Sequence, residues 1–252
     1  GRDLQTYGVA GTDRVSAGPS TTITRLYEQA TRLLGTNPPL YTRRPTDRAS
    51  RVSFSPGPLH GAVLLTQPLA AIVGGDDMRD DSPALRYALG VAMASALPRN
   101  AMLMGLSLAQ TKSVWSALLA AFGPAGSGRA LEAQASRLVE ALWTTMPARA
   151  QRRVQEILMS ADPELAPILE RTQQTTRRVG LFLAGDFESC VRTIAADAGI
   201  GEEELATGSL ETLCARPIVA DLLRLAVRPE YADARFRPLP EGPARPSGKF
   251  AV

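Results

Sequence analysis

The residues whose chemistry could support catalysis or metal binding are few in this chain. It holds a single histidine, His60, and four aspartates follow it, at Asp76, Asp77, Asp80 and Asp81. Because carboxylate oxygens bind hard divalent cations, His60 with Asp76, Asp77 and Asp81 could form the non-standard metal site of an enzyme. The aspartates lack the alternating ligand positions and the glycine of a calcium-binding loop. We therefore favour a solvated loop and keep the enzyme as an alternative hypothesis.

Nucleophilic side chains give no stronger signal. Cys190 and Cys214 are too few for a disulfide framework and are not spaced as C-x-x-C. We expect both to be reduced, buried thiols. The chain has no G-x-S-x-G motif that would mark a serine nucleophile. The sequence therefore offers no support for nucleophilic catalysis.

The charge pattern bears on the class of partner. The chain carries 28 basic and 25 acidic residues, a net charge of +3, and the two signs are largely interspersed. Such a balance does not predict nucleic-acid binding. No apolar run reaches the roughly eighteen residues of a membrane span, so we expect no membrane insertion and a soluble, cytoplasmic protein. We also expect no cofactor.

Composition divides the chain into three parts. Residues 1–20 are rich in Gly, Ser, Thr and Asp without periodicity, which is typical of a flexible linker. Residues 21–236 hold the periodic apolar segments and form the predicted domain. Residues 237–252 are rich in proline and are expected to form an extended tail.

Short apolar runs in the N-terminal third predict strands. These runs cover residues 39–43, 51–54 and 62–66, with a Pro-Gly-Pro sequence between the last two. A small sheet of three strands is expected there. Residues 68–72 are expected to turn into a short helix before a polar loop over residues 74–81.

From Ser82 onward the sequence predicts helices. Ser82 suits a helix cap and Pro83 suits the first turn. The helix over residues 84–97 is apolar nearly all round, as a buried central helix would be, and Pro98 is expected to end it. After this central helix, further helices are expected near residues 107–122, 130–143, 147–160, 164–183, 187–198 and 218–226. One more helix is expected before the sheet, near residues 22–34. The predicted fold class is α+β and predominantly helical, with the three-stranded sheet packed on a helical bundle.

Two segments carry a family resemblance. Residues 89–95 read Leu-Gly-Val-Ala-Met-Ala-Ser, where one kind of zinc peptidase carries Leu-Gly-His-Glu-x-x-His. Residues 176–186 contain Gly180, Leu181 and Asp186 in the manner of a second motif of the same peptidases. The expected order of elements also agrees: helix, small sheet, buried helix, helical insertion and long helix. Over residues 26–196 the chain therefore resembles the zinc metallopeptidases of the HtpX and CAAX-protease type, and the central helix resembles their active-site helix.

The resemblance implies a site that has lost its chemistry. It places the two histidine ligands on Val91 and Ser95, and the general base on Ala92. The third ligand falls on Gln173, and the aspartate of the second motif on Arg177. Catalytic zinc of this class needs two imidazoles, a carboxylate and an open position for water, with a carboxylate base beside it. The resemblance thus implies a domain without bound metal and without hydrolytic activity.

The resemblance also implies a remaining role for the edge strand that holds extended substrate in such peptidases. That strand is predicted at Ala62, Val63, Leu64, Leu65 and Thr66. The resulting hypothesis is an interaction or scaffold module that binds a peptide segment of a protein partner by strand addition. A purely structural domain of a larger protein is a further alternative.

Two other sets of side chains could face a partner. Six arginines could line one side of two adjacent helices and meet an acidic partner, although a solvated face is the usual role of such a run: Arg149, Arg152, Arg153, Arg171, Arg177 and Arg178. The tryptophans and several methionines are spaced either as core or as an adaptable binding surface, and we favour core: Trp115, Trp143, Met102, Met104, Met146 and Met159.

Overall fold

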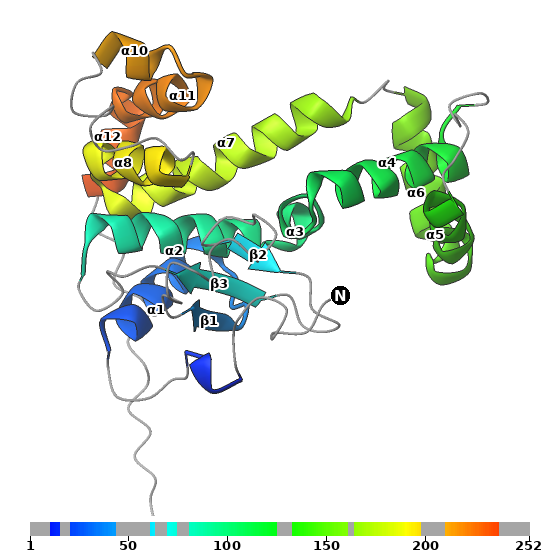
Figure 1. Cartoon of the computed structure of the whole chain (residues 1–252), viewed down its shortest axis with the longest axis horizontal. Coiled ribbons are helices and arrows are strands. Elements are labelled where there is room, and N and C mark those ends of the chain that lie inside the picture. The colour runs from blue at the N-terminus through cyan, green and yellow to red at the C-terminus, as the bar shows by residue number, and fades with distance from the viewer. Residues whose placement is uncertain are drawn as a thin grey trace, which may run out of the picture.

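The computed structural model describes residues 11–15, 21–43, 61–63, 70–74, 81–124, 133–160, 164–197 and 210–236. Within these ranges the chain is predominantly helical, as the sequence predicts, and it carries one small sheet (Figure 1). The central helix is α2 (Pro83–Ser95). It lies between the sheet with α1 (Thr22–Leu34) on one side, and α7 (Leu165–Ala184) with α8 (Phe187–Asp197) on the other.

Local sequence signals set the two ends of α1. The Thr21 hydroxyl accepts a hydrogen bond from the backbone N–H of Thr24 at 3.3 Å, which caps the first turn. Gly35 follows the last turn with a φ of 63°, a left-handed conformation that favours glycine. Leu26 and Ala30 lie one turn apart and are buried in the core that α1 shares with α2.

Three short strands form the sheet: β1 (Leu40–Arg43), β2 (Gly61–Val63) and β3 (Ala70–Gly74), in the order β1-β3-β2. β1 runs parallel to β3, and β2 runs antiparallel to it. Two strands overlap the segments predicted at residues 39–43 and 62–66. The strand predicted at residues 51–54 lies outside the described residues.

The short helix predicted at residues 68–72 is wrong. Residues 70–74 form β3, the central strand of the sheet. A short apolar run fits a strand or a buried helix equally well by periodicity. Ile72 and Val73 are β-branched, which suits a strand, and Ile72 lies opposite both Tyr41 of β1 and Gly61 of β2. Pairing on both sides therefore decides the conformation of this segment.

Part of the predicted linker lies against the sheet. The 3-10 helix η2 (Gly11–Asp13) is followed by a β-bridge between Arg14 and Tyr41 of β1. The backbone N–H of Val15 donates to the carbonyl of Leu40 at 2.8 Å. Residues 11–15 thus cover the outer side of β1.

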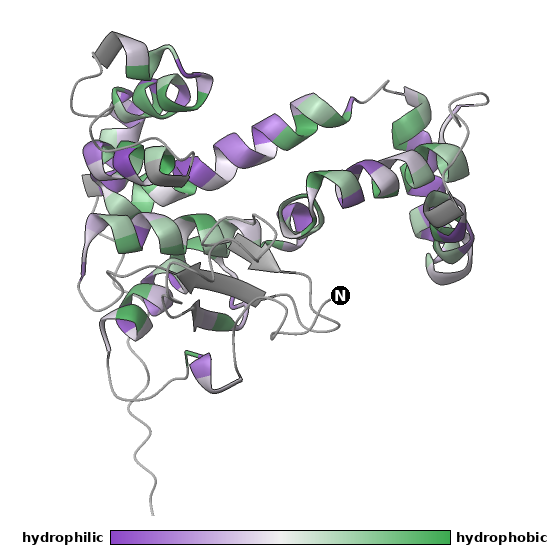
Figure 2. Ribbon diagram, in the orientation of Figure 1, coloured by the Kyte–Doolittle hydropathy of each residue, from purple (hydrophilic) through white to green (hydrophobic). Residues whose placement is uncertain are grey.

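The nearly continuous apolar sequence of α2 arises because both of its faces are buried. The Ser82 hydroxyl caps the helix by accepting from the backbone N–H of Leu85 at 3.2 Å, as predicted. One face contributes to a core with α1 and β1, built from Leu26, Ala30, Leu40, Leu85, Ala88, Leu89, Ala92, Met93 and Ala96. The other contributes Tyr87 to a second core, with Leu181, Ala184, Cys190, Ile194 and Leu222. Figure 2 shows α2 mostly in the apolar colours, in contrast to the polar middle of α7.

A pair of glycines forms the closest approach between α2 and α7. A Cβ atom at Gly90 would lie 2.8 Å from the Cα of Gly180 and 3.0 Å from the carbonyl oxygen of Val179. A Cβ atom at Gly180 would lie 2.8 Å from the ring of Tyr87 and from a methyl group of Val91. Only glycine leaves enough space at these two positions, so the backbones of the two helices pack directly on each other.

Three further helices complete the layer above α2: α10 (Leu210–Cys214), α11 (Pro217–Ala226) and α12 (Pro229–Phe236). Arg178 of α7 donates from Nε to Oδ2 of Asp221 on α11 at 2.9 Å, and its Nη2 donates to the other carboxylate oxygen. The Tyr231 hydroxyl on α12 donates to the carbonyl of Leu181 at 3.2 Å. These contacts attach the C-terminal helices to α7.

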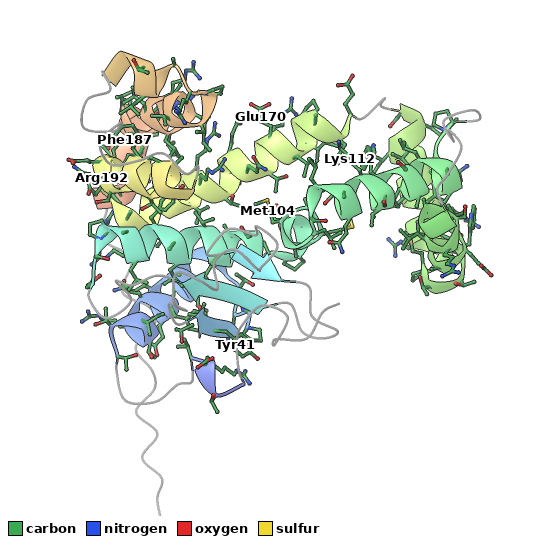
Figure 3. All side chains as sticks on the ribbon, in the orientation of Figure 1. Tyr41, Met104, Lys112, Glu170, Phe187 and Arg192 are labelled. Atoms are coloured by element: carbon green, nitrogen blue, oxygen red, sulfur yellow. The ribbon has the colours of Figure 1, made fainter. Side chains whose placement is uncertain are left out.

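The helices between α2 and α7 extend away from this layered body. After α3 (Pro98–Gly105) come α4 (Leu108–Phe122), α5 (Ala133–Thr145) and α6 (Ala148–Ser160). We call residues 107–160 the arm. α4 packs on both α5 and α6, and the arm projects to one side of the body (Figure 1). Figure 3 places Met104 where α3 leads into the arm and Lys112 on α4.

Three helices were missing from the sequence prediction: α3, α10 and α12. Pro98 follows the end of α2, as expected, but it also begins α3, because the first turn of a helix does not need the N–H that proline lacks. The turn between the helices is held by Asn100, whose side-chain amide donates to the carbonyl of Ala94 at 2.9 Å. A proline after a helix is thus an incomplete signal, since it also suits the start of the next helix.

The glycine contact predicts a strong effect of one methyl group. Gly90→Ala should lower the free energy of unfolding by about 2 kcal/mol, because the new Cβ meets backbone atoms that cannot rotate away. Urea denaturation followed by circular dichroism measures the change. Gly11→Ala is the matched control, since nothing lies within 4 Å of a Cβ at that position. Equal stability of the two variants would contradict the close approach of α2 and α7.

Candidate functional site

The three positions that the resemblance assigns to zinc chemistry on α2 are packed. Val91 is half-buried and places a methyl group against Gly180. Ala92 has 0% exposure and belongs to the core on the sheet side of the helix. Ser95 also has 0% exposure, and its hydroxyl makes no hydrogen bond with a described residue. Val91 and Ala92 have no lone pairs for a metal, and the buried Ser95 hydroxyl lacks the opening to solvent that a catalytic metal site needs.

The remaining two positions, Gln173 and Arg177, lie on α7. α2 and α7 run antiparallel: α2 leads toward α3 and the arm, whereas α7 returns from the arm toward α8 (Figure 1). Val91 and Ser95 follow Gly90 on α2, while Gln173 and Arg177 precede Gly180 on α7. In an antiparallel pair these four residues lie on the same side of the glycine contact. Gln173 is exposed and Arg177 is half-buried.

The strand predicted to bind a partner is at an edge of the sheet. β2 pairs with β3 through Ala62 opposite Ala71 and Val63 opposite Ala70, and no other described strand pairs with it. β2 also contacts α2 and α3. Leu64, Leu65 and Thr66 of the prediction lie outside the described residues. The two described positions therefore belong to a strand with one unpaired side in the described chain.

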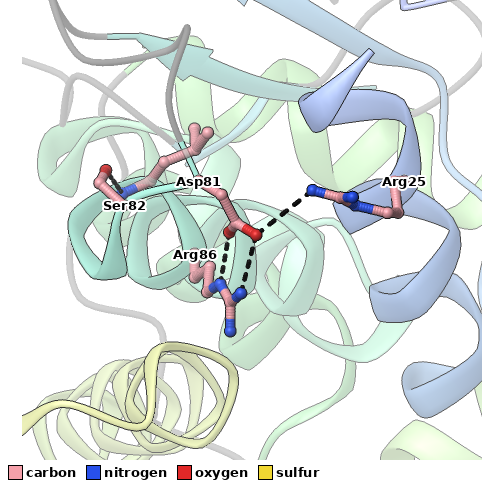
Figure 4. Close-up of polar contacts among 5 residues, drawn as sticks. Arg25, Asp81, Ser82 and Arg86 are labelled. Carbon is pink, nitrogen blue, oxygen red and sulfur yellow. Dashed lines mark hydrogen bonds and ion pairs between the residues drawn. The ribbon is translucent and has the colours of Figure 1, made fainter. Parts of the chain in front are cut away.

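Of the residues in the alternative metal site, only Asp81 lies within the described ranges. Asp81 accepts hydrogen bonds from Nε of Arg86 at 2.6 Å and from Nη2 of Arg86 at 2.9 Å (Figure 4). Arg25 of α1 adds a third contact at 3.4 Å. His60, Asp76, Asp77 and Asp80 lie outside the described residues. Both oxygens of Asp81 are thus engaged by guanidinium groups, which weighs against a role as a metal ligand.

The Asp81 interactions have an electrostatic signature. Hydrogen bonds from Arg86 lower the pKa of the Asp81 carboxyl below its ordinary value. A carboxyl with a lowered pKa in the folded state stabilises the fold above its unfolded pKa, and this contribution is lost as the pH falls through the folded pKa. Because the pair lies near the surface, its contribution is limited to about 1 kcal/mol. Its role is to join the start of α2 to α1.

No metal-ligand cluster occurs within the described ranges: no group of three or more His, Cys, Asp or Glu side chains gathers there. The two cysteines are free thiols, as predicted. Cys190 is buried, but Cys214 is only half-buried, which corrects the prediction for that residue. Cys214 lies at the end of the short helix α10. Burial, with a smaller effect of Asp186, raises the pKa of the Cys190 thiol to about 12.

Sequence reasoning missed the ion pair that links α7 to α11. Asp221 is a nearly buried acid in the apolar sequence Pro217–Ala226, and such an isolated charge is itself a signal of a partner. The hydrogen bonds to Asp221 raise the pKa of Arg178, so this arginine stays charged. Arg178 therefore has a structural role, which is to join α7 to α11.

The six arginines considered for one surface lie on two different helices. Arg149, Arg152 and Arg153 lie on α6 of the arm, whereas Arg171, Arg177 and Arg178 lie on α7. These two helices share no extensive contact. The possible single basic face across two adjacent helices is not supported, because α6 packs on α4 whereas α7 packs on α2.

No family model, curated protein or solved structure matches the chain. The metallopeptidase resemblance therefore depends on the residues and the helix arrangement given above. Among the described residues, no helix combines the length and the apolar character needed to span a lipid bilayer.

The thiol environments predict unequal reactivity. At pH 8, a pKa of about 12 leaves on the order of one Cys190 in ten thousand as the reactive thiolate. Cys190 of the native protein should therefore resist Ellman's reagent, while Cys214 reacts. Cys214→Ser should react only after denaturation, and Cys190→Ser should react without it. Rapid labelling of native Cys214→Ser would show that the helices around Cys190 do not protect it.

Proposed function

We propose that this chain is a metallopeptidase-like domain without metal or hydrolytic activity, and that it acts as a protein-interaction module. The observation that carries the proposal is the antiparallel crossing of α2 and α7 at Gly90 and Gly180. It places Val91 and Ser95 on the same side of the contact as Gln173, as a zinc site formed by these two helices requires. The helix arrangement thus supports the family resemblance, while the residue types exclude its chemistry.

The side chains at these positions support a structural use of the former site. Val91 packs on Gly180, Ala92 belongs to the core, and Ser95 is buried. Hydrocarbon groups here stabilise the helix pair through burial and dispersion. Nothing at these positions accepts the proton of an attacking water, because alanine stands in the place of the base.

The edge position of β2 supports partner binding. An unpaired strand edge presents backbone N–H and C=O groups to which an extended peptide can add. Residues 11–15 cover the outer side of β1, which leaves β2 as the edge available in the described chain. We therefore assign peptide binding to Ala62 and Val63, with an extended segment of a protein as the partner.

Zinc content tests the metal-free part of the proposal. The wild-type chain, purified without chelator or nickel resin, should contain close to no zinc by elemental analysis. The variant Val91→His/Ser95→His/Gln173→Glu should bind about one zinc ion per chain, because it restores two imidazoles one turn apart and a carboxylate from the facing helix.

Either of two results would contradict the metal-free part of the proposal. One tightly bound zinc ion in the wild-type chain would overturn the assignment of lost ligands. A restored variant that keeps its helical circular dichroism but binds no zinc would show that the resemblance is wrong. Val91→His alone serves as the control, since a single imidazole gives weak binding.

Photo-crosslinking tests the interaction part. Benzoylphenylalanine at position 62 should crosslink to a protein partner in a cell extract, whereas the same group in place of exposed Glu230 on α12 should not. Val63→Pro should abolish the crosslink, because proline removes a backbone donor from the strand. Val63→Thr keeps that donor and the β propensity, so it should leave the crosslink intact.

The proline result is interpretable only if the helices remain folded, which circular dichroism checks. Crosslinking that survives Val63→Pro in the folded protein would refute strand addition. Equal crosslinking from positions 62 and 230 would show that β2 is not a specific binding edge.

A further inference from the structure

The arm exposes large apolar side chains. Seven large apolar side chains are exposed among the described residues, and four of them lie on the arm: Leu108, Trp143, Ile157 and Met159. Trp143, Ile157 and Met159 are 50%, 47% and 60% exposed. The preference for core is therefore wrong at Trp143 and Met159, and also at Met102 on α3, which is 41% exposed. The ring of Trp143 touches that of buried Phe122 on one side, at 4.8 Å between centroids, and its exposed half remains available.

The arm also carries the net positive charge of the chain. Residues 107–160 contain six basic and three acidic side chains, a net charge of +3, which equals that of the whole chain. The other residues are neutral in sum. Arg149 and Arg152 are exposed and form no ion pair with a residue that the structure describes, whereas Arg153 pairs with Glu156 at 3.3 Å. Two guanidinium groups on α6 are thus available to an anionic partner.

The helical spacing of α6 places its exposed arginines next to its exposed apolar side chains. Arg149, Arg152 and Glu156 follow one another at three or four residues, which gives a charged stripe along α6. Met159 lies seven residues after Arg152 on one flank of this stripe, and Ile157 lies on the other flank. Figure 2 shows polar and apolar colours side by side on the arm.

The start of α6 is fixed against the end of α5. The side-chain amide of Gln151 donates to the carbonyl of Trp143 at 3.0 Å and to that of Met146 at 2.8 Å. The backbone of Trp143 is therefore held beside the first turn of α6. We call Trp143, Arg149, Arg152, Ile157 and Met159 the arm surface.

We propose that the arm surface binds an acidic amphipathic helix of a protein partner. Arginine, tryptophan and methionine are the residues enriched at protein interfaces, and large aromatic side chains with arginine carry much of the binding energy there. Carboxylates of the partner meet Arg149 and Arg152, and its apolar side chains cover Met159, Ile157 and Trp143. This site is separate from β2 and does not depend on the metallopeptidase resemblance.

Other anionic partners fit the arm surface less well. Nucleic-acid binding depends on many contacts between basic side chains and phosphates. The arm has a net charge of only +3, and its large exposed apolar groups would gain nothing from phosphates. A membrane-surface helix needs one continuous apolar face. On α6 the exposed apolar side chains lie on both flanks of the arginine stripe, and Leu158 is buried within the arm.

The binding experiment uses the full chain and a labelled synthetic peptide of roughly four helical turns, with glutamates along the centre of its binding face and leucines on both sides of them. Fluorescence anisotropy measures its dissociation constant. Arg149→Glu/Arg152→Glu should weaken binding about tenfold or more, through lost attraction and new repulsion. Ile157→Ser/Met159→Ser should also weaken it several-fold, because these exposed side chains contribute apolar contact.

The matched control is Arg99→Glu/Arg228→Glu, which makes the same change in net charge at exposed positions outside the arm. It should bind the peptide like the wild type. An equal loss in this control, or a failure of the wild type to bind, would refute a specific arm surface. Tighter binding to polyglutamate, to phosphatidylserine vesicles or to duplex DNA than to the peptide would overturn the assigned partner class.

Discussion

The direct backbone contact between Gly90 and Gly180 sets the distance between α2 and α7, the two helices with the most extensive contact, and the other layers are arranged around it. Because the two helices meet without side chains between them, the ring of Tyr87 and the methyl groups of Val91 lie beside the contact. The opposite face of α2 remains free to pack on α1 and the sheet. One helix thereby belongs to two cores, and this explains why its sequence is apolar on nearly every side.

The features that could be predicted from the sequence are those determined by nearby residues. Thr21, Ser82 and Ser107 each cap a helix by bonding within their own turn, so α1, α2 and α4 follow from local patterns. β3 and the division of the arginines could not be predicted, because they depend on distant partners. The candidate positions on α2 and α7 were identified by resemblance. How their side chains pack could not be predicted, because it depends on the glycine contact between residues far apart in the chain.

Under the proposed metallopeptidase resemblance, Val91, Ala92 and Ser95 stand at positions of a metal site but have a packing role. A metal site requires polar atoms, an opening and an exact coordination geometry, all of which limit how closely helices can pack. Valine, alanine and serine at 91, 92 and 95 remove those requirements and permit close packing between α1, α2 and α7. The two interaction sites that we propose lie at the periphery, at a strand edge and on the arm.

The sequence separation of the glycine contact also bears on how the protein folds. Gly90 and Gly180 close a loop of ninety residues that contains the whole arm, and the arm packs mainly on itself. The entropy cost of closing a loop grows only with the logarithm of its length, by about 0.6 kcal/mol for each doubling. The body can therefore accept arms of different lengths at little thermodynamic cost. Its folding rate, in contrast, depends on this distant pairing of α2 with α7, since non-local contacts form slowly.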